Sequence, residues 1–546
     1  MKRTIYTTVS ALALLAASPA LAGNNTSTVT QSGTNAIAAV NQGGANSDST
    51  VTQEGDANHA TVNQDGSHTG ASSTISQTGS SNDATVTQAD DGTGSDPINV
   101  STVEQSGSGN HATVSQNTAT YALQTRSDVN QSGNNNNANV TQVDDVQSST
   151  VAQSSDGNIA NVMQGDPALV GGDGSFGNTS YVTQGGTGGN TASVNQGGLV
   201  GYSNVNQQGG GNSATVGQTG ISNWSDVQQG GDDNGATVSQ AGDNTSGVNQ
   251  SGSGNSAFVT QSGNNGSTVL QSGTNGFASV TQNGANSSTV DQRANNNDAI
   301  VSQSGANSSS VTELGNNNAA RVSQSGTGNA STVTQNSGSG LVAYTGTELG
   351  QAILNDPNAT SYVNVQQVGD ALESTVNTTG ASNFAFVQQG GSDNHSSVIQ
   401  SGNGTAAFVE QAGSGNHSTF TQSGSLTNLT SSEVPNAGDN NIAAAQGVHQ
   451  TGNNNTSTIN QSGTATVFGV ANMVDVLQSG DGNTSGVDQG GVDNMADIDQ
   501  TGNGNMSTVL QGGVGNSATV LQSSDGNNSL VTQSGSGNAA YVTQGH

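Results

Sequence analysis

The sequence predicts an all-β fold, a β-solenoid of stacked coils of about 22 residues, each with the order strand–turn–strand–turn. Two observations carry this prediction. Gln recurs every eleven residues, first at Gln31, Gln42, Gln53 and Gln64. Over long stretches of the chain, the residue four positions before the repeated Gln alternates between Ser and Ala, so the full repeat has two unequal halves. The chain lacks the periodicity of an amphipathic helix.

Residues 1–22 have the pattern of a secretory signal peptide. Lys2 and Arg3 form a charged start, a short apolar run follows, and Ala20-Leu21-Ala22 provides a small-x-small cleavage site. The apolar run is too short to span a bilayer. We therefore expect export of the chain, with residues 23–546 as the mature repeat solenoid.

Each half of the repeat has the pattern S/A-x-V-x-Q, which is typical of a strand because alternate positions share one face. This spacing places Ser27, Val29 and Gln31 together on one side. Gly-rich segments such as residues 106–109 separate the halves, and Gly supplies the positive φ angles of tight turns. Each half is therefore predicted to be one strand and one turn.

A single coil cannot bury its thin face of Ser, Ala and Val, whereas stacked coils can. Ser-type strands then lie on Ser-type strands and Ala-type on Ala-type, which gives two parallel, in-register, amyloid-like sheets with about 4.8 Å between rungs. Gln and Asn side chains hydrogen-bond along the stack, so the inward polar groups are satisfied. The predicted core ladder contains Ser27, Val29, Gln31, Asn58, Ala60, Val62, Gln64, Ser101, Val103, Gln105, Asn110, Ala112, Val114, Gln116, Ser246, Val248, Gln250, Asn255, Ala257, Val259, Gln261, Ser529, Val531, Gln533, Asn538, Ala540, Val542 and Gln544.

Six segments interrupt the repeat. The prolines beyond the leader, Pro97, Pro167, Pro357 and Pro435, all fall in these segments. Pro removes a ladder donor and is excluded from the interior of a sheet. We expect irregular insertions near residues 89–100, 117–126, 165–179, 336–365, 423–447 and 464–477.

The pattern S-x-V-x-Q-x-G-x-x-N-x-A-x-V-x-Q resembles the curlin repeat of curli fibre subunits. It stands intact at residues 101–116, 246–261 and 529–544, and the resemblance covers nearly the whole chain after the leader. The resemblance implies a secreted bacterial structural subunit that polymerises into a functional amyloid fibre, a fimbrium that serves cell adhesion and biofilm matrix. It also implies self-association, a nucleator subunit and an outer-membrane secretion channel as partners.

The chain departs from the curlin pattern in two respects. It carries many more repeats than ordinary curlins. Its first repeat, at Ser27, follows the leader almost at once, without the targeting segment that ordinary curlins place there. The choice between major subunit and nucleator, and the use of the usual secretion channel, therefore stay open.

The composition excludes several classes of function. After the leader, three cationic side chains, Arg126, Arg293 and Arg321, face 37 acidic ones, a net charge of −34. The chain lacks the cations that would neutralise the phosphates of a nucleic acid. The same shortage argues against binding to an anionic membrane surface. Cys is absent, which excludes disulfides and Cys-ligated metals. We expect no cofactor.

Other solenoid functions require patterns that the sequence lacks. A catalytic β-helix needs acids clustered with Arg or Lys on one face, so we expect no enzyme. An ice-binding face needs Thr pairs at the same outward positions of successive coils. Thr28 and Thr30 form such a pair, but Asp128 and Asn130 occupy the equivalent positions of a later coil. A calcium-loaded adhesin needs tandem Asp-containing repeats, and fragments such as residues 171–174 occur singly. A non-polymerising extracellular adhesin or an ice-binding protein is kept as the alternative to a fibre subunit.

Two sets of outward side chains deserve separate interpretation. His395 and His417 are 22 residues apart and should lie on adjacent rungs, as a solvated column too poor in ligands for a metal. Aromatic residues at outward positions fit either lateral packing or scattered exposure. The outward His are His59, His111, His395 and His417, and the outward aromatics are Phe258, Phe386, Phe408 and Tyr541.

The repeat extends from Ser27 to Gln544 without a helical segment, a Pro or a charge run to block either end. Solenoids that stay monomeric cover their terminal coils. An uncovered coil exposes a row of N–H and C=O groups that can pair with another strand. We therefore expect head-to-tail association and growth that can be seeded.

Overall fold

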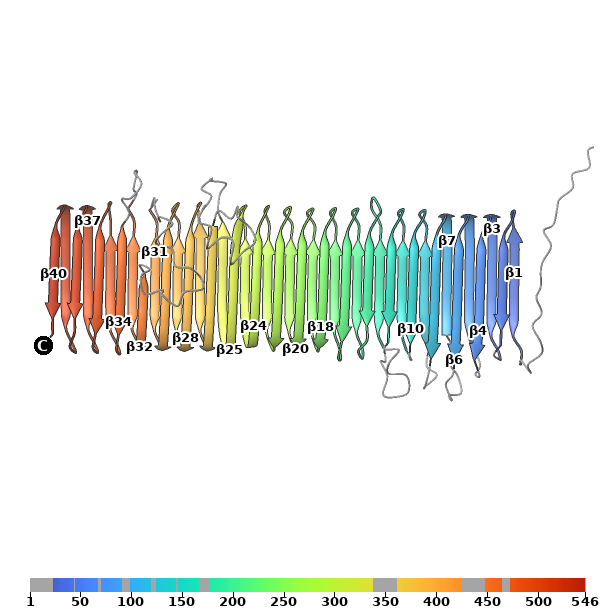
Figure 1. Ribbon diagram of the computed structural model, residues 1–546, viewed down its shortest axis with the longest axis horizontal. Coiled ribbons are helices and arrows are strands. Elements are labelled where there is room, and N and C mark those ends of the chain that lie inside the picture. The colour runs from blue at the N-terminus through green and yellow to red at the C-terminus, as the bar shows by residue number, and fades with distance from the viewer. Residues whose placement is uncertain are drawn as a thin grey trace, which may run out of the picture. The chain divides into compact units, whose positions relative to one another are not determined.

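The computed structural model describes residues 23–43, 45–66, 70–90, 99–118, 124–143, 146–165, 177–336, 361–424, 447–463 and 472–545. The chain divides into two compact units, Met1–Gly254 and Asn255–His546. Within each unit the described elements are β-strands, and consecutive strands run in opposite directions (Figure 1). The predicted all-β solenoid is confirmed. The predicted signal peptide lies outside the described residues.

In the first unit, each strand pairs in parallel with the next strand but one, so the chain alternates between two sheets. We call them the serine sheet and the alanine sheet, after the inward residue four positions before the Gln. The serine sheet contains β1 (Thr26–Ser32), β3 (Asp48–Asp56), β5 (Ser72–Ser80), β7 (Asn99–Ser108), β9 (Thr125–Gln131), β11 (Ser148–Gln153), β13 (Thr179–Gln184), β15 (Tyr202–Gln207), β17 (Trp224–Gln229) and β19 (Thr245–Gln250). The alanine sheet contains β2 (Ile37–Gln42), β4 (His59–Gly66), β6 (Asp83–Asp90), β8 (His111–Thr118), β10 (Asn137–Val143), β12 (Ile159–Gln164), β14 (Thr191–Gln196), β16 (Ser213–Thr219) and β18 (Gly235–Gly242).

The second unit has the same two kinds of sheet. Two long strands, β24 (Asp298–Glu313) and β25 (Asn318–Asn336), continue through the turn and contribute to both. Its alanine sheet also contains β20 (Ser256–Gly263), β22 (Phe277–Gly284), β26 (Ser361–Asp370), β28 (Phe384–Ser392), β30 (Ala406–Ser414), β32 (Val448–Asn453), β34 (Met473–Ser479), β36 (Met495–Thr501), β38 (Ser517–Gln522) and β40 (Ala539–Gln544). Its serine sheet also contains β21 (Gly266–Gln271), β23 (Ser287–Gln292), β27 (Glu373–Thr379), β29 (His395–Gln400), β31 (His417–Gln422), β33 (Thr456–Gln461), β35 (Thr484–Gln489), β37 (Met506–Val514) and β39 (Asn528–Ser536).

Equivalent residues lie directly on one another in neighbouring rungs, a rung being one strand level of a sheet. Between β7 and β9, for example, Ser101 pairs with Ser127 and Gln105 with Gln131. The register is fixed because a slip of one residue would move every inward side chain to the outer face. The alternation of Ser and Ala in the sequence therefore becomes a separation of Ser and Ala into two sheets.

The core between the two sheets is thin and built from small side chains. Val103, Ala112 and Val114 have no exposed surface, and the inward Gln and Asn side chains are equally buried in the interior rungs. A core of this composition offers little apolar area per residue. Ordered hydrogen bonds among the inward amides must therefore accompany the apolar burial, because unpaired buried amides would destabilise the fold.

Stacked glycines form the turns between the sheets. Gly79 has a φ angle of 101°, and a Cβ atom there would overlap the carbonyl oxygen of Gly107 in the next coil. In the second unit, Gly513 has a φ angle of 104° and lies against Gly535 in the same way. Both the positive φ and the close approach of successive coils require Gly at these positions.

Two predicted insertions are too wide. Residues 361–365 form part of β26, and residues 473–477 form part of β34. In both strands a Val occupies the inward place of Ala, since Val363 pairs with Ala320 and Val474 with Ala496. The S/A-x-V-x-Q pattern therefore did not detect them.

The remaining insertion bounds overlap strand ends by two residues or fewer. Most of the predicted insertions fall on residues 91–98, 119–123, 166–176, 337–360, 425–446 and 464–471, which lie outside the described residues.

Candidate functional site: the inward ladders and the terminal rungs

Inward glutamines form hydrogen-bonded ladders in both sheets. In the first unit, Gln77 Nε2 donates to Gln105 Oε1 and Gln105 Nε2 donates to Gln131 Oε1, each at 2.8 Å. In the second unit, Gln478 Nε2 donates to Gln500 Oε1 at the same distance. In each of these links the donor is on the earlier rung and the acceptor on the later one. The ladders therefore have a fixed direction along the chain.

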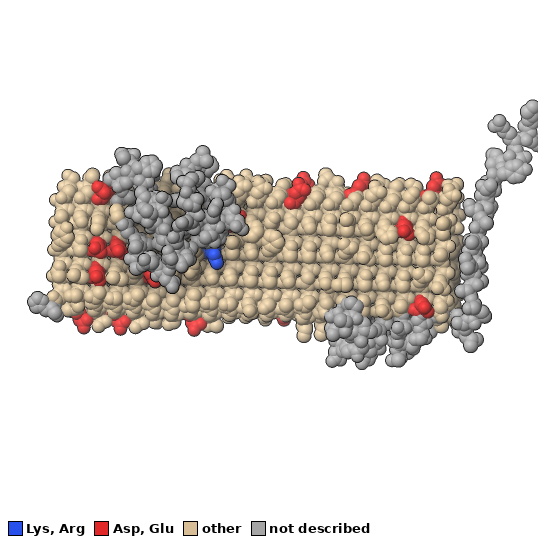
Figure 2. All heavy atoms as spheres, viewed as in Figure 1, with Lys and Arg blue, Asp and Glu red and all other residues tan. Residues whose placement is uncertain are grey.

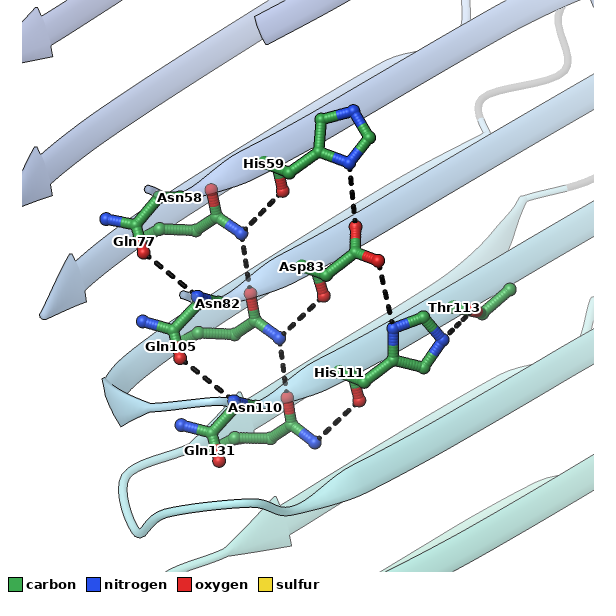
Figure 3. Close-up of polar contacts among 10 residues, drawn as sticks. All are labelled: Asn58, His59, Gln77, Asn82, Asp83, Gln105, Asn110, His111, Thr113 and Gln131. Carbon is green, nitrogen blue, oxygen red and sulfur yellow. Dashed lines mark hydrogen bonds and ion pairs between the residues drawn. The ribbon is translucent and has the colours of Figure 1, made fainter. Parts of the chain in front are cut away.

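The same amide nitrogens also connect the two sheets. Gln105 Nε2 donates to the backbone oxygen of Asp83, and Gln131 Nε2 to that of His111, both at 3.0 Å (Figure 3). Each inward Gln of this region thus bonds to the next rung of its own sheet and to a strand of the opposite sheet. This double use explains why an amide is needed at the position, because it offers both an acceptor and two donors.

A second ladder of asparagines runs along the turns that precede the alanine sheet. The backbone N–H of Asn82 donates to Asn58 Oδ1 at 3.0 Å, and that of Asn110 donates to Asn82 Oδ1 at 3.1 Å. Asn82 Nδ2 in turn donates to the backbone oxygens of Thr78 and Gly107. Asn at this position therefore holds one turn to the next, and Figure 3 shows the three Asn side chains in a column.

The structure places all the sequence-predicted ladder residues at inward positions of the two sheets, but it does not bury them equally. Those in interior rungs, such as Asn110, Val114 and Gln116, are almost fully buried. The first rung of the first unit is different, because Ser27 and Gln31 are exposed and Val29 is half-buried. In the second unit, Ala540, Val542 and Gln544 of β40 are half-buried and Asn538 is exposed.

An outward column in the first unit brings together two of the expected histidines and a carboxylate that the sequence reasoning missed. Asp83 lies between His59 and His111 on successive rungs, 3.3 Å from the Nδ1 atom of each ring (Figure 3). Thr113 Oγ1 lies 3.3 Å from His111 Nε2. The signal was available in the repeat, because Asp83 occupies the same strand position as the two histidines.

The expected pairing of His395 and His417 on adjacent rungs is found in the second unit. The rings stack with centroids 4.6 Å apart and an interplanar angle of 7°. Glu373 Oε2 lies 3.0 Å from His395 Nδ1. Burial lowers the pKa of His417, the neighbouring His395 lowers it further, and Glu373 acts in the opposite direction.

The outward aromatics fall into two groups. Phe258 and Tyr541 are exposed, at 45% and 79%. Phe408 is only 4% exposed, and its ring centroid lies 5.3 Å from that of Phe384, which in turn contacts Tyr362. The four aromatics therefore do not share one environment. Phe386, which pairs with Phe408 on the neighbouring rung, is half-buried in the same cluster.

Charged side chains occupy little of the molecular face drawn in Figure 2. Within the described ranges, no group of three or more His, Asp or Glu side chains has the arrangement of a metal site. In the same part of the chain, no helix has the length and apolarity to cross a bilayer. Among the described residues, the candidate functional features are therefore the inward hydrogen-bonded ladders and the terminal rungs at which these ladders end.

The repeats of the chain match those of a known family. The curlin associated repeat matches residues 55–89, 231–263, 469–502, 491–522 and 513–545. The chain therefore carries curlin repeats. The last three curlin-repeat matches begin 22 residues apart, which is the separation of the bonded glutamines Gln478 and Gln500. Successive curlin-repeat matches in this region are therefore offset by one coil of the solenoid. No curated protein matches the chain.

Proposed function

We propose that the chain is a secreted structural subunit that self-assembles into a curli-like amyloid fibre, copy upon copy, through its terminal rungs. The observation that carries this proposal is the exposure of the inward columns in those rungs. Val29 of β1 and Val542 of β40 are partly exposed, whereas Val51 and Val520, one rung further in, have no exposed surface. Apolar side chains on an unpaired edge favour association with another strand.

The hydrogen-bonding groups of the two terminal rungs are complementary. Among the described residues, Gln31 and Gln42 donate to the next rung but accept from none, so their Oε1 atoms are acceptors without a donor. Gln533 and Gln544 accept from the preceding rung, and their Nε2 atoms donate only to backbone oxygens. A second copy with Gln31 on Gln533 and Gln42 on Gln544 would continue both ladders.

The order of the sheets supports the same arrangement. The second unit ends with a serine strand, β39, followed by an alanine strand, β40. The first unit begins with a serine strand, β1, followed by an alanine strand, β2. Stacking one copy on the next therefore preserves the alternation and leaves Ser on Ser and Ala on Ala. The mechanism is parallel in-register addition, as in cross-β assemblies.

The biological setting follows from the curlin repeats rather than from the geometry. Their presence favours an extracellular, cell-surface fibre that serves adhesion and biofilm matrix, with a structural rather than a catalytic role. The leader pattern of residues 1–22 supports export. A nucleator subunit and an outer-membrane secretion channel are the partners we propose.

The direct test is to express residues 23–546 and examine the product by fibre diffraction and by binding of thioflavin or Congo red. We expect fibres with a meridional reflection at about 4.8 Å. Assembly should accelerate when preformed fibres are added, because an existing terminal rung acts as the template. A chain that has the β-sheet spectrum but stays monomeric at high concentration would contradict the proposal and favour a non-polymerising adhesin.

A further inference from the structure

The glutamine ladder of the serine sheet in the second unit contains two residues that are not Gln. Glu313 of β24 lies between Gln292 of β23 and Gln335 of β25. Two rungs after Glu313, Thr378 of β27 lies between Gln335 and Gln400 of β29. These two positions interrupt a ladder that is otherwise built from amides.

Glu313 occupies the glutamine position with one oxygen too many. Its side chain has no exposed surface. Its Oε2 atom accepts a hydrogen bond from Gln292 Nε2 at 2.8 Å, as a Gln Oε1 atom would. Its Oε1 atom therefore takes the place of the amide nitrogen, and this buried atom has no hydrogen-bond partner. The next acceptor along the ladder, Gln335 Oε1, is also buried without a partner.

The surroundings of Glu313 contain no cation that would stabilise a buried carboxylate. Asp291 of β23 and Arg293, the first residue after this strand, lie outside the core and bind each other at 2.7 Å. None of the ion pairs found within the described residues involves Glu313. On β27 the outward Glu373 pairs with His395, and on β25 Arg321 stands at an outward position of the alanine sheet.

The electrostatics agree with this geometry. Burial raises the pKa of Glu313 well above its usual range. The hydrogen bond from Gln292 acts in the opposite direction, and the negative charge of Asp298, at the start of β24, raises the pKa further. An ionised carboxylate in this position would be a buried charge with one hydrogen bond, which is strongly destabilising.

We infer that Glu313 is held as a neutral carboxylic acid whose proton is donated to Gln335 Oε1, so that this rung is a proton-dependent link of the ladder. With the proton present, both orphaned oxygens are satisfied by one O–H···O hydrogen bond, and the ladder continues from Gln292 to Gln335. With the proton absent, two acceptor oxygens face each other and the link opens. This inference concerns the interior of the second unit and holds whether or not the chain assembles.

Thr378 creates a second break in the same ladder, next to the proton-dependent link. Thr is too short to reach the neighbouring amides, and Thr378 Oγ1 and Gln400 Oε1 are both buried without partners. The amide ladder resumes only where Gln400 Nε2 donates to Gln422 Oε1 at 2.9 Å. Loss of the Glu313 link therefore adjoins an existing break, and the rungs from β23 to β29 become the weakest part of this sheet.

The test compares the full-length chain with its Glu313→Gln variant in denaturant unfolding from pH 5 to pH 9. Because the folded pKa is raised above the ordinary value of 4.5, the acid's contribution is fully present below that value and is lost as the pH rises through the folded pKa. The wild-type unfolding constant should rise about tenfold per pH unit within this window relative to the variant. Glu54→Gln, the same change on the exposed part of β3, is the matched control and should follow the wild type.

Infrared difference spectroscopy provides a second readout that does not require unfolding. At neutral pH, the spectrum of wild type minus Glu313→Gln should contain the C=O band of a protonated carboxyl group. The difference between wild type and Glu54→Gln should lack it. Absence of the band, or a stability difference between wild type and Glu313→Gln that is flat from pH 5 to pH 9, would overturn the inference.

Discussion

At the scale of single residues, the inward position before each turn is occupied by an amide side chain. Its oxygen accepts a hydrogen bond from the earlier rung, and its NH₂ group donates to the later rung and to the opposite sheet. Gln105 fills all of these roles. Glu313 has the right length but lacks the amide N–H groups, so it can donate only when it is protonated, and Thr378 has a hydroxyl but is too short. The cost of each exception follows from the number of buried groups that it leaves without a partner.

The stacked histidines should make the solenoid sensitive to acid. The folded pKa of His417 is lowered below the ordinary value of 6.5, so the unfolded chain binds the proton more readily and stability is lost as the pH falls through 6.5. We expect His417→Asn to be more stable than wild type at pH 5 and unchanged at pH 8. The gain should be at most about 1 kcal/mol, because the ring is exposed to solvent. Thermal unfolding at the two pH values measures it.

His59→Asn is the matched control for this prediction. Its ring lies beside the carboxylate of Asp83 rather than beside another imidazole. This variant removes an outward imidazole and leaves the stacked pair of His395 and His417 in place. An equal gain in both variants would show that stacking of His395 and His417 is not the cause.

At the scale of the strand, the inward face must stay free of charged side chains, whereas the outward face tolerates them. Gln229, Gln240 and Gln250 are at most 1% exposed. Lys at all three positions would bury cations without partners, which costs several kilocalories per mole each. We expect loss of the β-sheet signal in circular dichroism at neutral pH.

The control places three Lys residues on the outer face of β18 and β19, two of the three strands that carry the inward substitutions. Thr237, Ser239 and Asn249 are outward residues of β18 and β19. Their replacement by Lys should preserve the spectrum. Equal disruption by both sets would contradict the assignment of inward and outward faces.

Period-two alternation was sufficient to predict the strands, their faces and the separation of Ser from Ala, because each of these depends on local spacing alone. Features that depend on neighbouring rungs were harder to predict. The bonded rungs Gln64 and Gln88 are 24 residues apart, and Gln88 and Gln116 are 28 apart. Asp83 therefore does not stand at a fixed distance from both His59 and His111, and its place between them was missed.

Residues that replace a member of the pattern were also missed. Val363 and Val474 fill the place of Ala in an equally buried position. Glu313 and Thr378 fill the place of Gln. A search for the S/A-x-V-x-Q pattern does not detect such rungs. In the structure they are identified by their strand register and hydrogen bonds.

At the scale of the whole molecule, growth through the last rung can be tested by blocking it. We predict that a chain with Val542→Pro, Tyr541→Lys and Thr543→Lys folds normally but elongates at least about tenfold more slowly on seeds. Pro at position 542 disrupts the pairing of the last rung with β38, because the backbone groups on this side of β40, such as the carbonyl of Gln544, face β38. The Lys residues repel an incoming copy. Seeded thioflavin kinetics measure the rate.

A chain with Lys at the outward positions Thr237 and Ser239 controls for the added charge, because these residues lie far from the last rung in sequence. It should elongate at the wild-type rate. If the blocked chain also elongates at that rate, growth does not proceed through β40.

The unequal spacing of bonded rungs has a consequence for the entropy of the chain. Gln218 and Gln240 are 22 residues apart, whereas Gln324 and Gln367 are 43 apart, yet their ladder bonds measure 2.9 and 2.7 Å. Loop-closure entropy grows only with the logarithm of length, so doubling the intervening chain costs about 0.6 kcal/mol. A coil can therefore gain a segment as long as itself for less than the net value of one hydrogen bond. A segment inserted between two rungs must return the chain to the same strand register. The length of the inserted segment itself has little effect on stability.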